Sequence, residues 1–392
     1  MRQTGGVRYI KKSELLEDVY TYNDFSCDGV NKGLANPDKV SERLVPYLVT
    51  EHNGHMFPTR IDDNEARKLE QALRHLYVIE DAFGTDRISG AIGWCFADYN
   101  THDQFGASDR ICYHGVMDMF RLPKYAAYTY MSQKQNQDPV LEVASSMAPG
   151  EGDRNVLPPI FVFTNCDYVK AYIDDYYLGK NYSEWELFPN IPNAPIIIDD
   201  FIGNRILENE PFSKKVATRI KDLIISYNKN GFSMPLKDKM KIIDLMLFHH
   251  FNMKKMVAIF GKYSGNDSTH TPVYRFEGYT DDKLVKTITM GAPKKAILKV
   301  YPDCTSLVHG DTYDVVRVVV RMEDEYSNTR PLARDVVSIE TSEGLVAIGP
   351  DRVALLGGSI AFFLKTTGKT GKAKATFAAS GFEPVDVEFE IR

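Results

Sequence analysis

Two short apolar segments, each followed at once by polar residues, constrain the fold of this chain more than any other feature. The first is Tyr47-Leu-Val-Thr50, which leads into Glu51, and the second runs from Ile88 to Phe96 and leads into Asp98. Both segments are almost wholly apolar, as strands are when helices cover both faces of a parallel sheet. The carboxyl ends of parallel strands meet at one edge of the sheet, so the sequence predicts a pocket there.

A helix is predicted between these two strands. Apolar residues recur every three, four or seven positions over residues 64–83, Asp62 or Asp63 is placed to cap the start, and Gly84 ends the pattern. A further strand is expected at 18–22 and a further helix at 123–135. The first part of the chain thus alternates strands and helices, which is the pattern of an α/β domain.

Beyond residue 136 the pattern changes to short strands separated by turn residues. Residues 137–292 predict a β-sandwich interrupted by a helical insertion at about 205–262, with helical segments at 213–227 and 237–260. Residues 293–392 predict an immunoglobulin-like sandwich with strands at 315–322, 336–341, 359–366 and 373–379. The expected fold class is therefore α/β followed by β.

The composition argues against nucleic acid and membrane as partners. The net charge is −6 and the pI about 5.9, whereas both partners favour a basic patch. No apolar run approaches the roughly 18 residues that span a bilayer, and no charged-then-apolar leader begins the chain. The five cysteines are scattered without metal-binding spacing, which predicts free thiols in a reducing compartment and a cytoplasmic protein.

Glu51 is the candidate catalytic residue. A carboxylate at the carboxyl end of a buried strand is placed where barrel enzymes have their active site. The plainer alternative is a structural glutamate that caps a loop or pairs with Arg60 or Lys68. Trp94, at the end of the second strand, can form an apolar platform for a sugar ring or simply pack in the core.

The histidines raise two further possibilities. His114 lies in a mixed polar and apolar segment typical of a loop over a site, although a lone histidine is more often structural. His52, His55 and His102 invite a zinc hypothesis, but they lack the spacing of ligands on one helix face, so no metal is predicted. The sequence has no phosphate-binding glycine motif, and no cofactor is expected.

Four segments carry a resemblance to a known family. They are Glu17-Asp-Val-Tyr-Thr-Tyr-Asn-Asp-Phe25, Thr50-Glu-His-Asn-Gly-His-Met-Phe-Pro-Thr59, Gly93-Trp-Cys-Phe-Ala-Asp-Tyr-Asn-Thr-His102 and Asp109-Arg-Ile-Cys-Tyr-His-Gly-Val-Met-Asp-Met-Phe-Arg121. Together they closely resemble the family 2 glycoside hydrolases of the β-galactosidase type. The resemblance implies that residues 1–136 are the C-terminal half of a (β/α)8 barrel, followed by two immunoglobulin-like sandwiches.

The resemblance also implies roles for individual residues. Glu51 matches the nucleophile of a retaining mechanism, and Trp94 matches the tryptophan beneath the sugar. Tyr22 and Asn23 match the end of the preceding barrel strand, where a tyrosine supports the nucleophile, and Tyr20 is the alternative to Tyr22. The other residues implied as sugar contacts are His114, where many relatives have asparagine, His55 and Asp98.

One required group is missing from the pattern. A retaining glycosidase needs a second carboxyl group about 5 Å from the first, which acts as acid and base. In the family that this chain resembles, that group is a glutamate after an asparagine, upstream of the nucleophile. The pairs Asn64-Glu65 and Asn209-Glu210 both follow Glu51. The acid/base residue is therefore predicted to be absent from this chain.

The resulting hypothesis is that the chain is part of a retaining hydrolase of terminal β-galactosides, with β-glucuronides and β-mannosides as alternative substrates. Its partners would be a β-linked glycoside or oligosaccharide and either the missing N-terminal half of the enzyme or further copies of the chain. The competing hypothesis is a catalytically inactive fragment, from a truncated or split gene, that serves as a scaffold or a carbohydrate-binding module.

Overall fold

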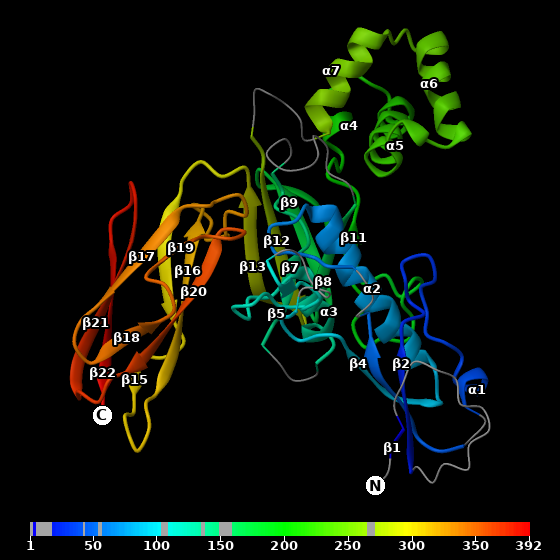
Figure 1. The fold of residues 1–392 in the computed structure, drawn as a ribbon. Helices are drawn as coiled ribbons and strands as arrows, with labels where there is room; N and C mark the ends of the chain where they lie inside the picture. Colours follow the sequence, from blue (N-terminus) through cyan, green and yellow to red (C-terminus); the bar gives the residue numbers. More distant parts are fainter. Residues whose placement is uncertain are drawn as a thin grey trace. The chain divides into compact units, whose positions relative to one another are not determined.

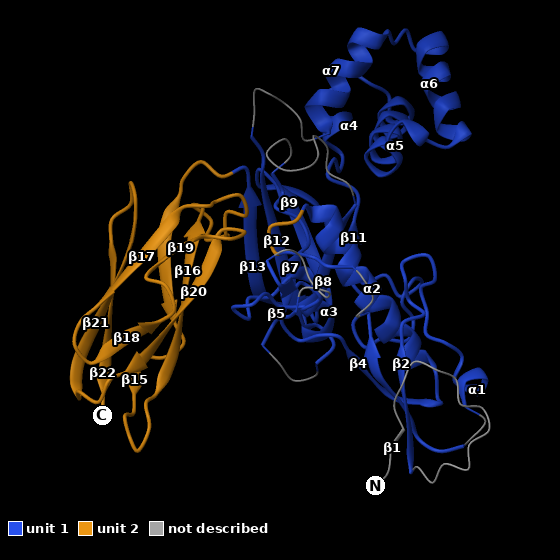
Figure 2. Cartoon of the chain, in the orientation of Figure 1, with its two compact units in different colours: residues 1–60, 64–292 blue, residues 61–63, 293–392 orange. Residues whose placement is uncertain are grey.

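The computed structural model describes residues 3–4, 18–41, 44–53, 57–102, 109–134, 138–148, 159–264 and 271–392. These form two compact units, one of residues 1–60 and 64–292 and one of residues 61–63 and 293–392 (Figure 2). The fold is mixed α/β, with most of the regular structure in sheets and few helices. The domain limits at 136 and 292, the half barrel and the two immunoglobulin-like sandwiches remain predictions.

A parallel four-stranded sheet opens the first unit. Its order is β1-β2-β3-β4, and each neighbouring pair is parallel (Figure 1). The strands are β1 (Gln3–Thr4), β2 (Val19–Asp24), β3 (Tyr47–His52) and β4 (Ile88–Gly93). The predicted second strand is shorter than expected, because the chain beyond Gly93 leaves the sheet and bonds to another loop.

Helix α2 (Glu65–Gly84) connects β3 to β4, within one residue of the prediction at either end. Its N-cap is Asn64, whose side chain accepts a hydrogen bond from the Arg67 amide at 2.8 Å, rather than Asp62 or Asp63. The short helix α1 (Pro37–Val40) joins β2 to β3, and α3 (Tyr125–Met131) lies within the predicted 123–135.

Two clusters of buried side chains hold this part together. On the sheet, Tyr20 stacks on Tyr47 at 5.6 Å between ring centroids, and both pack with Val40 of α1. In the second cluster, Leu76 of α2 packs with Ala126 of α3 and with Phe163 of the following sheet. Helix α2 also meets the parallel sheet, where the ring of His75 contacts that of His52 in β3.

Two antiparallel sheets with a common core make up the middle of the chain. One has the order β11-β8-β7 and the other the order β10-β9-β12-β13. The strands are β7 (Leu141–Val143), β8 (Ile160–Thr164), β9 (Tyr168–Ile173), β10 (Tyr176–Asn181), β11 (Ile196–Ile198), β12 (Val273–Thr280) and β13 (Lys283–Gly291). Val162 of the first sheet and Phe276 of the second belong to one cluster and are fully buried.

A helical insertion lies between β11 and β12. It contains α4 (Arg205–Asn209), α5 (Lys214–Asn230), the 3-10 helix η1 (Gly231–Ser233), α6 (Leu236–Phe248) and α7 (Met253–Tyr263). The predicted helical segment 237–260 is two helices, because the chain turns at His250, which has a left-handed φ of 53°. The insertion has a core of its own, in which Ile224 and Leu245 are each 1% exposed.

The second unit consists of two further sheets, with orders β14-β16-β20-β18 and β15-β22-β21-β17-β19. The strands are β14 (Ile297–Pro302), β15 (Ser306–Leu307), β16 (Val315–Glu323), β17 (Val336–Thr341), β18 (Leu345–Ile348), β19 (Arg352–Ala354), β20 (Ser359–Thr366), β21 (Gly371–Ala379) and β22 (Val385–Ile391). Across both units, none of the described helices has the length and apolar character needed to cross a bilayer.

Candidate active site

Glu51 lies at the carboxyl end of β3, where the neighbouring strand supplies its hydrogen-bond donor. The Asn23 amide Nδ2 donates to Glu51 Oε2 at 3.2 Å, and the Thr50 hydroxyl donates to Asn23 Oδ1 at 2.8 Å. The ladder between β2 and β3 shifts its register between Tyr22 and Asn23, which places Asn23 opposite Glu51. This chain of bonds fixes one carboxylate oxygen of Glu51.

The alternative of a structural ion pair is not seen among the described residues. The Arg60 guanidinium pairs with Asp109 at 3.0 Å, and the Lys68 ammonium lies over the ring of Tyr125 at 5.3 Å. Glu51 is half-buried, and this burial raises the pKa of its carboxyl above the usual glutamate value. A neutral amide donor such as that of Asn23 orients a carboxylate without compensating its charge.

Trp94 follows β4 directly and lies at the same edge of the sheet as Glu51. The parallel ladder pairs His52 with Gly93, and the Trp94 amide donates to the His52 carbonyl at 2.9 Å. The indole is half-buried and meets the ring of Tyr99 edge-on, with centroids 6.0 Å apart. The Trp94–Cys95 peptide bond is cis.

His114 is brought to this edge by backbone pairing between two loops. The amide of Cys95 donates to the His114 carbonyl at 3.4 Å, and the amide of Val116 donates to the Cys95 carbonyl at 2.9 Å. Gly115 is required here, because a Cβ at this residue would lie 2.2 Å from the amide nitrogen of Asp98. His114 itself is buried, with 7% of its surface exposed.

Asp98 is held inside the protein by a buried ion pair. Lys124 Nζ donates to Asp98 Oδ1 at 2.7 Å and to the Thr59 carbonyl at 2.6 Å, and the Gly115 amide donates to the same Oδ1 at 2.9 Å. Burial raises the pKa of Asp98 to about 6, against the opposing effect of the Lys124 ammonium, and burial lowers the pKa of Lys124. This pair joins the loops that follow β3 and β4. A contact of Asp98 with substrate remains a prediction.

The structure describes some of the other predicted site residues and not others. Tyr22 and Tyr20 are both buried on one face of β2, so the choice between them stays open. His55 lies outside the described residues. His102 is exposed and His52 fully buried, and the part of the chain that is described has no group of three His, Cys, Asp or Glu side chains placed to hold a metal ion.

The sequence reasoning missed three residues that support this edge. Thr50 orients Asn23, and Lys124 fixes Asp98. His75 of α2 meets the ring of His52 edge-on at 5.7 Å and bonds through Nδ1 to the Tyr130 hydroxyl at 2.8 Å. A lone lysine just before an apolar helix was a usable signal for Lys124, whereas nothing in the sequence pairs His75 with His52.

The two Asn-Glu pairs have structural roles. Glu65 begins α2 and accepts hydrogen bonds from the Ser145 hydroxyl and the Ser146 amide. Glu210 accepts from Lys262 at 2.7 Å and from the Tyr263 hydroxyl at 3.0 Å. Burial opposes ionisation of Glu210, but these bonds outweigh it and lower its pKa, whereas an acid catalyst requires a raised one.

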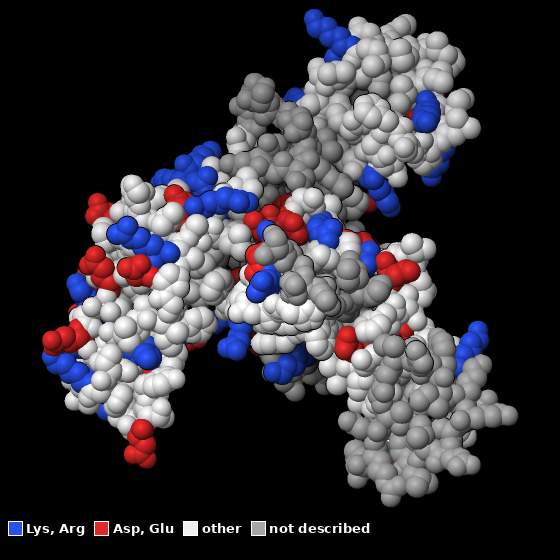
Figure 3. Space-filling view, viewed as in Figure 1, with Lys and Arg blue, Asp and Glu red and all other residues white. Residues whose placement is uncertain are grey.

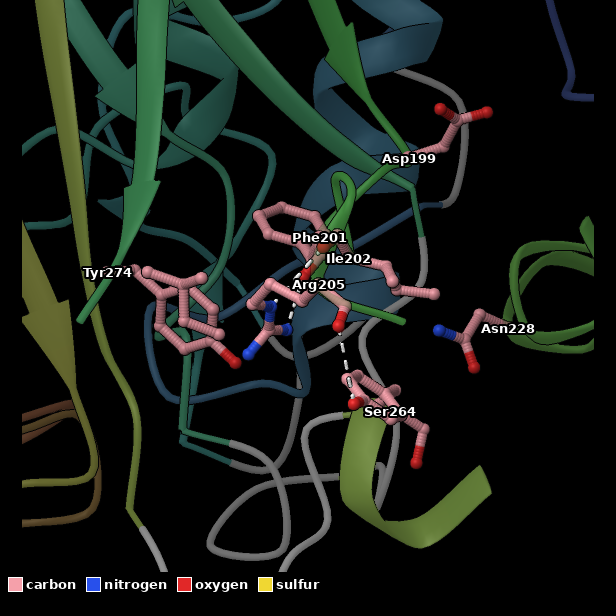
Figure 4. A pocket seen from close by; sticks show the side chains of 9 residues that line it. Asp199, Phe201, Ile202, Arg205, Asn228, Ser264 and Tyr274 are labelled. Carbon is pink, nitrogen blue, oxygen red and sulfur yellow. Dashed lines mark hydrogen bonds between the residues drawn. The ribbon is translucent and has the colours of Figure 1, made fainter. Parts of the chain in front are cut away.

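A small cavity lies elsewhere, between the insertion and the middle sheets (Figure 4). It contains none of the predicted site residues. Its lining includes Arg205, whose guanidinium donates to the carbonyls of Phe201 and Ile202, and the buried Tyr274. These contacts brace the base of the insertion.

Comparison with known proteins identifies relatives for most of the chain. No protein-family model matches it. A β-galactosidase of Thermoanaerobacterium thermosulfurigenes is 38% identical over 362 residues, which cover 91% of this chain and 43% of that protein. A β-galactosidase of Rhizobium meliloti is 32% identical over 373 residues, covering 91% and 42% respectively. The chain thus spans less than half the length of the curated relatives it matches.

Solved structures share the fold at low sequence identity. A β-glycosidase from Bacteroides vulgatus has a TM-score of 0.58 at 13% identity, over 95% of this chain and 45% of that one. A β-glucuronidase from glycoside hydrolase family 2 has a TM-score of 0.55 at 16% identity, over 97% and 34%. With β-galactosidases 32–38% identical over most of its length, the chain belongs to the family 2 glycoside hydrolases and corresponds to their C-terminal portion.

Proposed function

We propose that this chain supplies the nucleophile of a retaining β-galactosidase and acts together with an N-terminal portion that carries the acid/base residue. The observation that carries the proposal is the placement of Glu51 at the carboxyl end of a parallel strand, hydrogen-bonded by Asn23 at 3.2 Å and free of an ion pair among the described residues. A nucleophilic carboxylate has to be ionised and exposed to the sugar, and a neutral amide donor orients it without neutralising it.

The reaction follows from the two-carboxylate mechanism. One oxygen of Glu51 attacks the anomeric carbon while the acid/base residue protonates the departing glycosidic oxygen, giving a glycosyl ester of Glu51. The acid/base then removes a proton from water, which attacks the anomeric carbon and frees the carboxylate. Trp94, at the same edge, is proposed as the apolar floor beneath the sugar ring, and His114 as a contact on the opposite loop.

The incomplete sheet supports the half-barrel proposal for residues 1–136. In the described residues the parallel sheet has four strands, whereas a (β/α)8 barrel needs eight. Its edge strand β4 exposes Ile92 by 53%, and the following Phe96 is 62% exposed. Parallel sheets normally have both faces covered, so we propose that further strands of the N-terminal portion pair with β4 and cover these residues.

Galactosides are the proposed substrates, in keeping with the names of the relatives at 32–38% identity. A β-glucuronide would require a cation for its carboxylate. Lys124, which follows the loop that carries His114, is buried and already bound to Asp98 and to the Thr59 carbonyl. Its ammonium therefore has no free approach to the carboxylate of a glucuronide.

Covalent labelling tests the proposal. The chain would be combined with the N-terminal portion of a relative and treated with an activated 2-deoxy-2-fluoro-β-galactoside, whose fluorine slows hydrolysis of the glycosyl ester. We expect one added fluorosugar, located at Glu51 by peptide mass spectrometry, and no labelling of a Glu51→Gln variant. Labelling of another carboxylate would reject Glu51 as nucleophile. A combination that hydrolyses no nitrophenyl galactoside and takes up no label would favour the inactive scaffold.

A further inference from the structure

Helix α6 of the insertion is apolar on two opposite faces, although only one of them packs against the protein. At about 100° per residue, Leu236, Met240, Ile243 and Leu247 fall within about 60° of one another. Leu245 and Asp238 lie on the opposite side of the helix. A helix that is apolar on both sides is expected to be buried on both sides.

The inward face of α6 is fully used. Leu245 is 1% exposed and belongs to the core of the insertion with Ile224 and Ile259. Asp238 is also buried, and its carboxylate accepts a hydrogen bond from the Ser226 hydroxyl of α5 at 2.7 Å. The core of the insertion is therefore packed without the other face of α6.

The outward face is exposed along its whole length. We call these four residues the α6 stripe, and their exposed fractions are 77% for Leu236, 57% for Met240, 48% for Ile243 and 66% for Leu247. The part of the insertion visible in Figure 3 is correspondingly mostly uncharged, with a few Lys and Arg side chains. Contiguous exposed apolar surface of this kind marks an interaction site.

We propose that the α6 stripe pairs antiparallel with the α6 stripe of a second copy of this chain, across a two-fold axis. The intervals between the four residues are four, three and four positions. This order is the same in both directions along the helix. In an antiparallel pair, Leu236 of each copy meets Leu247 of the other, and Met240 meets Ile243, so every layer is apolar on both sides.

The charges beside the stripe fit the same register. Lys237 and Asp244 lie on one flank, and in the antiparallel pair Lys237 of one copy comes opposite Asp244 of the other, twice by symmetry. Within the chain, Asp244 pairs with Arg219 and lies 3.6 Å from His249. In a parallel pair across a two-fold axis, the flank of Lys237 would instead face the opposite flank of the partner, which carries Lys239, so the charges favour the antiparallel arrangement.

The exposed area of the α6 stripe sets the expected affinity of the dimer. The stripe exposes on the order of 450 Å² per chain, and flanking side chains add to it, so the pair buries close to the roughly 1,200 Å² at the lower limit of stable interfaces. We therefore expect a dimer with a dissociation constant of about 1–100 μM. Two-fold pairing closes the assembly at two copies.

Sedimentation velocity of the whole chain between about 1 and 100 μM tests the proposal. We expect a concentration-dependent monomer–dimer equilibrium that Met240→Lys/Ile243→Lys weakens at least tenfold. The matched control is Val308→Lys/Val336→Lys, which replaces two exposed valines of the second unit and leaves the equilibrium unchanged. A chain that stays monomeric throughout, or a Met240→Lys/Ile243→Lys variant that associates like the parent, overturns the proposal.

Charge reversal tests the register. Lys237→Glu is expected to weaken the dimer severalfold, and the double variant Lys237→Glu/Asp244→Lys to restore it, because the pairs re-form with opposite polarity. Circular dichroism and thermal melting check that loss of the Arg219 contact leaves the insertion folded. A folded double variant that remains as weak as Lys237→Glu would reject the antiparallel register.

Discussion

The parallel sheet of the first unit and the two sheets of the second unit differ in how fully they bury their apolar side chains. In the second unit, Leu364 of one sheet and Phe377 of the other are both fully buried within the unit. In the first, edge strand β4 leaves Ile92 half-exposed beside the candidate site. The region that carries the candidate chemistry is thus the one whose edge strand is exposed, and the second unit carries none of the predicted site residues.

The largest effect should come from removing the carboxylate. Glu51→Gln in the completed enzyme keeps the shape and the Asn23 contact but cannot form the glycosyl ester. We expect turnover of a nitrophenyl galactoside to fall by at least about 10⁴-fold, more than 5 kcal/mol of transition-state stabilisation. The matched control is Glu340→Gln, at an exposed position of β17 in the second unit, which should leave turnover unchanged. Near-normal turnover in Glu51→Gln would contradict the proposed function, in which Glu51 is the nucleophile.

The next largest effect tests how well the second unit is packed. Phe377→Ala empties a fully buried position of β21 and should cost about 3–5 kcal/mol of the second unit's stability. Phe96→Ala, at a position 62% exposed, should cost less than about 1 kcal/mol in this chain. Urea unfolding followed by hydrogen exchange of each region measures both. Equal costs would show that the two regions are equally well packed.

Acid should weaken the first unit through buried histidines. Burial lowers the pKa of His52 to about 4, and burial, His52 and Lys124 lower the pKa of His75. An unfolded histidine has a pKa of about 6.5, so below that pH the unfolded chain binds protons that the folded chain refuses. The stability is complete above pH 6.5 and is lost as pH falls towards 4, by at most about 3 kcal/mol for His52.

A histidine-free variant isolates this contribution. His52→Leu should flatten the fall in urea stability between pH 7 and pH 4.5, whereas the exposed His250→Asn should not alter it. Asparagine is chosen for the control because His250 has a left-handed φ of 53°, which asparagine tolerates. An unchanged pH dependence in His52→Leu would mean that His52 takes up its proton without unfolding.

The smallest effect concerns the orientation of Glu51. Asn23→Ala removes the donor to the carboxylate and should lower kcat/KM roughly tenfold, or about 1.4 kcal/mol. The lost hydrogen bond favoured the ionised form, so the pKa of Glu51 rises further and the acid limb of the pH–rate profile moves to higher pH. Thr50→Val, which frees the Asn23 amide, should shift both quantities less in the same direction. If the acid limb does not move in Asn23→Ala, the hydrogen bond from Asn23 does not influence the ionisation of Glu51.

The sequence was most informative where structure depends on local pattern. The period of α2 located it within one residue, and β17 and β20 have the bounds expected from their alternation and turns. The same reasoning joined α6 and α7 into one segment, because the turn at His250 is stabilised by packing of the insertion and not by a glycine or proline.

At the candidate site, the sequence could identify the residues but not their contacts. Glu51 and Trp94 stand out because polar residues end apolar strands. The bond from Asn23 depends on a register shift between β2 and β3, and the Asp98–Lys124 pair joins residues 26 positions apart. Such contacts are set by tertiary packing, and the paired histidines His52 and His75 are visible only once α2 lies beside β3.

The backbone pairing between residues 95–98 and 114–117 has a consequence for changing substrate preference. Gly115 leaves no room for a side chain against Asp98, and Lys124 bonds to Asp98 through its ammonium and to the Val116 carbonyl through its amide. We therefore expect Trp94 and His114 to move as one rigid unit. Exchanging either loop alone with that of a relative would disrupt the backbone hydrogen bonds between them. We therefore expect the specificity of the proposed enzyme to be transferred only when both loops are grafted together with Lys124.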